Sequence, residues 1–269
     1  MTGPNIGRKV LEWTRGTGRN ACLEGGGRFV RIREVLDRSL PSARYGDLLL
    51  LNGRLPLVKF VLGGRGEVNL VCDYPGEAIT ETTLEVLLGA FGRALQAYAG
   101  VRTGRCLRPL NHRCLPPVWA EAAQEVLSLL DGDTWVVCEA EEGFDIRPVG
   151  DPSARAVHLS VELDVVLRLL VVPEFPAHRH AEEALCTWLL MVGDRIHLVQ
   201  GVQSEKGALG FGLRLTPAVV GDVILRDALD ALWAAGSSLE EECEALCNPQ
   251  GATAFLRAIG STFPDRKEG

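Results

Sequence analysis

The sequence predicts an α+β fold made of two copies of one module, with antiparallel sheets and a C-terminal helical tail. The main observation is an internal repeat, in which residues 51–62 (LNGRLPLVKFVL) align without a gap on residues 192–203 (VGDRIHLVQGVQ), an offset of 141. The same frame continues into two apolar stripes, at 84–91 and 225–232. A repeat of this length indicates a whole module rather than a solenoid unit. We therefore expect each copy to have the order α-β-β-β-α-β-β-α.

Length and composition agree with two globular modules. The 269 residues are 46% hydrophobic and 23% charged, which excludes a disordered or fibrous chain. The chain is also long enough for two domains of ordinary size. We place a first module with a shortened third strand at 1–100, a linker at 101–117, the second module at 118–236, and a helical tail with a disordered end at 237–269.

The elements of the first module follow from apolar periodicity and turn residues. We expect an opening helix at 6–14, a hairpin of strands 20–24 and 28–34 around three glycines, a middle helix at 45–53, a second hairpin of strands 58–62 and 67–73, and a last helix at 82–98. Thr82 and Glu85 have the spacing of a capping box, which predicts the start of that last helix.

The second module repeats this plan with about 26 additional residues. We expect a helix at 119–130, a hairpin of strands 135–138 and 144–149, one long strand at 157–172, a middle helix at 177–193, a hairpin of strands 196–203 and 208–215, and a last helix at 219–235. Aligning Phe29 with Phe144 assigns the additional residues mostly to the long strand. The tail is expected to be helical at 237–260, with a break at Asn248-Pro249.

Charge is distributed unevenly between the two halves. Residues 1–113 carry 17 Lys/Arg against 10 Asp/Glu, whereas the remainder carries 11 against 25. The halves therefore either face each other, or the first offers a surface to an anionic partner. No apolar run reaches the roughly 18 residues that cross a bilayer, and the N-terminus lacks an apolar signal core. We expect a cytoplasmic protein with reduced cysteines and no membrane partner.

No catalytic, cofactor or metal site is predicted, although several residue types were weighed. A zinc site would need four compact N/S ligands, and the spacing of Cys106, His112 and Cys114 in the linker is not a standard one. The other candidates are the pair His178 and His180, the pair Cys243 and Cys247, the acidic residues at 131–142, and His158. The motif Gly-x-Ser-x-Gly is absent, and the glycine clusters lie in hairpin turns rather than before a helix.

Nucleic-acid binding is an alternative that rests on the basic first half. Arg28, Arg31 and Arg33 lie on one predicted strand, where alternation puts Arg31 and Arg33 on the same sheet face next to Phe29. Arginines interleaved with an aromatic residue suit a single strand of nucleic acid. The linker adds Arg102, Arg105, Arg108 and Arg113. Solvated arginines are common, however, and the whole chain is acidic.

The order of elements, together with three segments, resembles the superfamily that unites class I type III secretion chaperones with YbjN-like proteins. The segments in the first copy are LLLLN (48–52) with LPLVKFVL (55–62), VNLVCDYP (68–75), and TETTLEVLLGAF (80–91). Their counterparts in the second copy are LLMVGDRIHLVQG (189–201), GALGFGLRLTP (207–217) and DVILRDALDALW (222–233). The resemblance covers residues 5 to 235 and leaves out the tail.

This resemblance implies binding rather than catalysis. Members of the superfamily form homodimers and present sheet and groove surfaces to segments of client proteins. We therefore expect a non-enzymatic, chaperone-like or regulatory protein whose partner is a protein client. Two fused copies would form the dimer within one chain, which predicts a pseudo-symmetric monomer.

Overall fold

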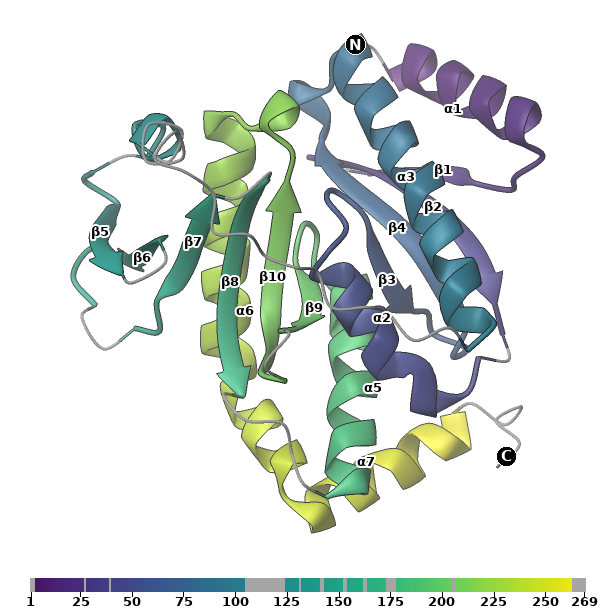
Figure 1. The fold of residues 1–269 in the computed structure, drawn as a ribbon, viewed down its shortest axis with the longest axis vertical. Helices are drawn as coiled ribbons and strands as arrows, with labels where there is room; N and C mark the ends of the chain where they lie inside the picture. The colour runs from purple at the N-terminus through teal and green to yellow at the C-terminus, as the bar shows by residue number, and fades with distance from the viewer. Residues whose placement is uncertain are drawn as a thin grey trace.

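Two antiparallel sheets with helices packed against them organise the chain, as Figure 1 shows. The computed structural model describes residues 3–26, 28–38, 40–104, 124–130, 132–140, 143–151, 154–161, 164–172, 178–204 and 207–262. The predicted α+β class, with its antiparallel sheets and helical tail, is confirmed. Buried apolar side chains from both sheets belong to one continuous core.

The first sheet has the strand order β1-β2-β4-β3. Its elements are α1 (Gly3–Thr17), β1 (Cys22–Gly26), β2 (Phe29–Asp37), α2 (Tyr45–Asn52), β3 (Lys59–Leu62), β4 (Val68–Pro75) and α3 (Glu81–Arg102). Helix α3 buries the predicted apolar stripe, including Leu84 and Phe91, against the sheet. The predicted capping box is wrong, because the helix is capped by Thr80, whose hydroxyl oxygen accepts a hydrogen bond from the Thr83 amide at 3.0 Å.

The second sheet has six strands in the order β5-β6-β7-β8-β10-β9. Its elements are β5 (Trp135–Ala140), β6 (Gly143–Pro148), β7 (Val157–Val161), β8 (Val165–Val172), α5 (Arg179–Arg195), β9 (Gln200–Gln203), β10 (Leu209–Leu215), α6 (Asp222–Cys247) and α7 (Pro249–Thr262). Residues 124–127 are helical, within the range expected for the opening helix. Helix α6 packs against β7, β8 and β10.

The predicted long strand at 157–172 is wrong. Strand β7 ends at Val161 and β8 begins at Val165, and these two residues face each other across an antiparallel pair. The chain therefore reverses direction between Val161 and Val165. Two acidic residues, Glu162 and Asp164, interrupt the apolar pattern between the strands and indicate a turn. The apolar residues on either side nevertheless favour a single strand when the sequence is considered alone.

Register identifies which strands of the two modules correspond. Arg33 of β2 faces Val71 of β4, and Arg168 of β8 faces Gly212, the residue that the 141-residue offset matches to Val71. A β-bulge also interrupts both pairs at the same place, opposite Val68 in the first module and opposite Leu209 in the second. Strand β2 is thus the counterpart of β8, and β1 is that of β7. The alignment of Phe29 on Phe144 is wrong, and so is the shortened third strand.

The hairpin of β5 and β6 is therefore the addition in the second module. In the first sheet, β1 is the outermost described strand, whereas in the second sheet β6 and then β5 continue beyond β7, the counterpart of β1. The described second module has the order α-β-β-β-β-α-β-β-α, one strand more than expected.

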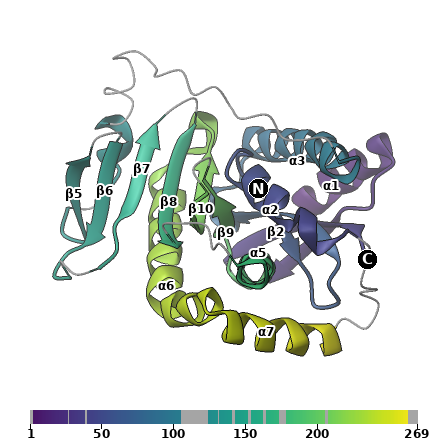
Figure 2. The same ribbon diagram turned by 60° about the horizontal axis from the view of Figure 1, so that its bottom comes forward.

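The modules exchange contacts through their middle helices, each of which packs on the innermost strand of both sheets. Helix α2 of the first module packs on β9 of the second, and α5 of the second packs on β3 of the first. Figure 2 shows α5 on one side of the first sheet, with α1 and α3 on the other. The inner edges of both sheets are covered by this exchange.

Equivalent residues reach across this interface, although they bind different backbone carbonyls. Buried Lys59 donates to the carbonyl oxygens of Ile196 at 2.7 Å and Val199 at 3.0 Å. Gln200, its counterpart at the offset of 141, is also buried and donates to the carbonyl oxygen of Asn52 at 2.9 Å. Leu57 and Leu198 are equivalent too, and both have a positive φ, of 67° and 64°. The repeat seen in sequence is thus a repeat of structure.

The tail begins as a continuation of the last helix. Helix α6 runs without interruption to Cys247, so the predicted end of that helix at residue 235 is wrong. The predicted break at Asn248-Pro249 is confirmed, because α7 starts at Pro249 and turns back to pack on α5. Over the described ranges, no helix is both long and apolar enough to span a membrane.

Candidate functional site

The β5–β6 hairpin lies at the outer end of the second sheet and is the strongest candidate for a binding surface. Strand β5 pairs with β6 and is the last described strand of the sheet. In Figure 1 the hairpin lies at the left, farther from α6 than β7 and β8. Such an edge strand presents one row of backbone N–H and C=O groups to a further strand.

Strand β5 also exposes apolar side chains on both of its faces. Val136 is 46% exposed and its neighbour Val137 is 36% exposed, although successive residues of a strand point to opposite faces. Cys138 and Glu139 are exposed as well. Proteins usually protect an edge strand by covering or charging it, so two exposed valines in the middle of an edge strand indicate a surface that another chain can cover.

The other sheet edges are placed differently. Strands β3 and β9 contact each other where the modules meet, and α5 and α2 pack on them. Strand β1 lies next to α1, with Leu23 of the strand close to Gly7 of the helix. Strand β5 is therefore an outermost strand that also exposes apolar side chains.

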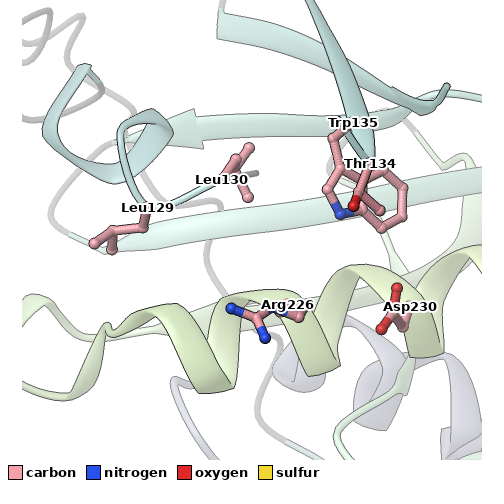
Figure 3. A pocket seen from close by; sticks show the side chains of 6 residues that line it. All are labelled: Leu129, Leu130, Thr134, Trp135, Arg226 and Asp230. Atoms are coloured by element: carbon pink, nitrogen blue, oxygen red, sulfur yellow. The ribbon is translucent and has the colours of Figure 1, made fainter. Parts of the chain in front are cut away.

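A pocket lies beside the first residue of β5, between this strand and α6. Its empty volume is about 300 Å³, and it is lined by Leu129, Leu130, Thr134, Trp135, Arg226 and Asp230. Figure 3 shows the two α6 side chains, Arg226 and Asp230, opposite the residues that lead into β5. The pocket thus combines an apolar wall with one cation and one anion.

The arginines proposed for nucleic-acid contact are engaged inside the protein. Arg31 is buried and its Nε lies 2.5 Å from Asp73 Oδ1, while its Nη1 donates to the carbonyl oxygen of Asp194 at 2.7 Å. Arg33 donates to Asp194 Oδ1 at 2.7 Å. Arg28 lies on the surface, 2.8 Å from Asp227 of α6. The contacts with Asp194 and Asp227 cross between the modules, so the opposite charges of the two halves do face each other, and the arrangement does not favour nucleic-acid binding.

Asp73 is the centre of this ionic cluster. Besides Arg31, its carboxylate contacts Lys59 Nζ at 2.6 Å and His197 Nδ1 at 3.2 Å. Burial alone would raise the pKa of Asp73, but Lys59, His197 and Arg31 together hold the pKa of this carboxyl well below its usual range. We interpret the cluster as structural, because each of its charged groups has a partner in the fold.

The residues weighed for metal binding or catalysis do not form a site over the ranges that the structure describes. Within these ranges no three metal-binding side chains come together. His178 and His180 stack edge-to-face with ring centroids 5.4 Å apart, and His158 pairs with Asp145 at 3.1 Å. Cys243 is buried while Cys247 is exposed, and burial raises the pKa of the Cys243 thiol to about 12. The linker residues Cys106, His112 and Cys114 lie outside the described residues.

Comparison with known proteins gives no family, because no family model, curated protein or solved structure matches the chain. The resemblance to secretion chaperones therefore stays a prediction.

Sequence reasoning found the hairpin of β5 and β6 but missed its position at an exposed edge. The signal that would have placed it is the pair of acidic residues, Glu162 and Asp164, between two apolar runs, because a reversal between Val161 and Val165 adds one strand to the sheet and moves β5 to the outside.

Proposed function

We propose that the chain is a non-enzymatic protein-binding module, chaperone-like or regulatory, that acts in the cytoplasm and takes an extended segment of a partner protein on the edge of β5. The observation that carries this proposal is the exposure of Val136 and Val137 on opposite faces of an outermost strand. A segment that adds to this edge would gain main-chain hydrogen bonds, and its alternate side chains would cover the two valines.

Charge supports a basic segment as the partner. Glu139 of β5 is exposed, and the chain from residue 114 onward carries 11 Lys/Arg against 25 Asp/Glu. A second copy of this chain would bring the same acidic half to the edge, so like charges would oppose pairing of β5 with itself. A segment that contains both lysine and apolar residues would cover the two valines and carry a charge opposite to that of their acidic surroundings.

The test uses two defined peptides, one alternating lysine with valine and one alternating glutamate with valine. We expect the lysine peptide to shift the NMR signals of the β5 amides in a saturable way and the glutamate peptide to have a much smaller effect. Raising the salt concentration should weaken the first interaction, because charge contributes to it. An oligonucleotide titrated at low salt tests the nucleic-acid alternative in the same experiment.

Two valine variants distinguish binding at the β5 edge from non-specific hydrophobic binding. Val136→Lys places a charge on β5, and Val35→Lys is its control in the other sheet, because Val35 is 50% exposed on β2, where it faces Asn69 of β4. The proposal predicts that Val136→Lys abolishes peptide binding and that Val35→Lys leaves it unchanged. Equal loss in both variants, or shifts confined to the first module, would contradict it.

A further inference from the structure

One of the side chains that line the pocket beside β5 carries a buried hydrogen-bond donor. Trp135 is 5% exposed, and its indole N–H has no acceptor among the described residues. Figure 3 shows the indole among the lining residues, with Arg226 and Asp230 of α6 across from it. A buried polar group without a hydrogen-bond partner costs free energy. An acceptor that enters the pocket and binds the indole N–H would remove this cost.

The lining restricts which chemical group can enter. Leu129, Leu130 and the Trp135 ring give it an apolar wall, and the charged side chains of Arg226 and Asp230 stand opposite. An aliphatic group would leave the indole N–H unpaired. A carboxylate would meet Asp230, and an ammonium group would meet Arg226, so each of these charges would face a like charge.

A phenol matches both the apolar and the polar parts of this lining. Its ring matches the apolar wall, and its hydroxyl can accept a hydrogen bond from the Trp135 N–H or from Arg226 while it donates to Asp230. The empty volume of about 300 Å³ includes space that is open to solvent, so the pocket takes one side chain at most. We propose that this pocket binds a tyrosine side chain of the partner segment, an inference that rests on the proposed function.

The probe for the pocket is p-cresol, which is the tyrosine side chain as a free molecule, and toluene is its match without the hydroxyl. The chain has five tryptophans, whose indole N–H signals can be followed individually by NMR. We expect p-cresol at millimolar concentration to move the Trp135 signal saturably and to bind roughly two- to tenfold more tightly than toluene, the ratio that one hydrogen bond provides.

Two tryptophan variants provide the controls. Trp135→Phe keeps an aromatic ring but removes the donor, so the preference for p-cresol over toluene should fall to what Arg226 and Asp230 alone provide. Trp188→Phe is the matched control, because the Trp188 indole already donates to Glu242 at 3.1 Å, and the preference should survive. The Trp233 indole N–H, which is also buried and has no acceptor among the described residues but lies outside the pocket lining, should not respond.

The outcomes distinguish this inference from the proposed function. Equal binding of toluene and p-cresol, or an unchanged preference in Trp135→Phe, would overturn the tyrosine assignment, while peptide-induced shifts on β5 would leave the proposed function standing. If the peptides do not bind to β5 but p-cresol binds as expected, the edge site is wrong and the phenol-binding pocket remains. Absence of any saturable shift at Trp135 would overturn the pocket itself.

Discussion

Asp73 shows at the scale of one residue how the modules are held together. Its carboxylate is buried between Arg31 and Lys59 of its own module and His197 of the other. Removing one member of a buried ionic group leaves the others uncompensated. We expect Asp73→Ala to lower the free energy of unfolding by about 3–5 kcal/mol, measured by urea denaturation. Glu77→Ala is the control, because Glu77 pairs with Arg28 on the surface and should cost about 0–1 kcal/mol.

The same carboxylate makes a prediction about acid stability. The pKa of Asp73 is lowered in the folded state, so its contribution to stability is present above the unfolded value of about 3.9 and is lost as the pH falls toward the folded value. We expect the wild-type protein to lose this contribution below about pH 4. Asp73→Ala should show a smaller loss of unfolding free energy over the same interval. Parallel curves for the two proteins would show that Asp73 does not couple folding to protonation.

At the scale of elements, one glycine allows the additional hairpin of β5 and β6 to pair closely with β7. Gly143 begins β6 with a φ of 147°, and a Cβ atom there would lie 2.2 Å from the carbonyl oxygen of Leu159 on β7. Gly143→Ala should therefore weaken the pairing of β6 with β7 by at least about 1–3 kcal/mol. Amide hydrogen exchange should show lost protection in β5 and β6 and unchanged protection in the first sheet.

Gly64→Ala, between β3 and β4 of the first sheet, is the control for Gly143→Ala. No atom lies within 4 Å of a Cβ built at Gly64. Its exchange pattern should match that of the wild type. If Gly143→Ala instead unfolds both sheets together, the hairpin is not the peripheral addition that the register indicates.

The elements also show what can be predicted from sequence. The α2 and α5 helices, the strands that follow them and the break before α7 were correctly located, because each has local periodicity or a proline. The turn between β7 and β8 was not, because apolar residues on both sides of Glu162-Leu163-Asp164 made one strand the simpler interpretation. The pocket beside Trp135 could not be predicted, because it depends on how α6 lies relative to β5.

At the scale of the whole molecule, the surfaces through which two modules would pair are already occupied within one chain, because α2 and α5 pack across the boundary between the modules. The contacts between Lys59 or Gln200 and the opposite module are made within one chain. We therefore expect light scattering at micromolar concentration to give a mass near 29.1 kDa. A stable dimer would mean that a further surface, such as the β5 edge, also pairs between chains.

The exchanged helices further predict that the two modules unfold together. Helix α5 covers β3 and helix α2 covers β9, and the buried side chains of both modules belong to one core, so unfolding either module would expose apolar surface of the other. Amide hydrogen exchange in increasing denaturant should give α3 of the first module and α6 of the second the same free energy of opening, and both should merge with the global transition. The slowest amides of the two helices should therefore give the same free energy of opening within the error of the measurement. A first module that opens at lower denaturant while α6 stays protected would show that the modules are independent domains, in which case the ionic cluster around Asp73 joins two finished folds rather than completing one.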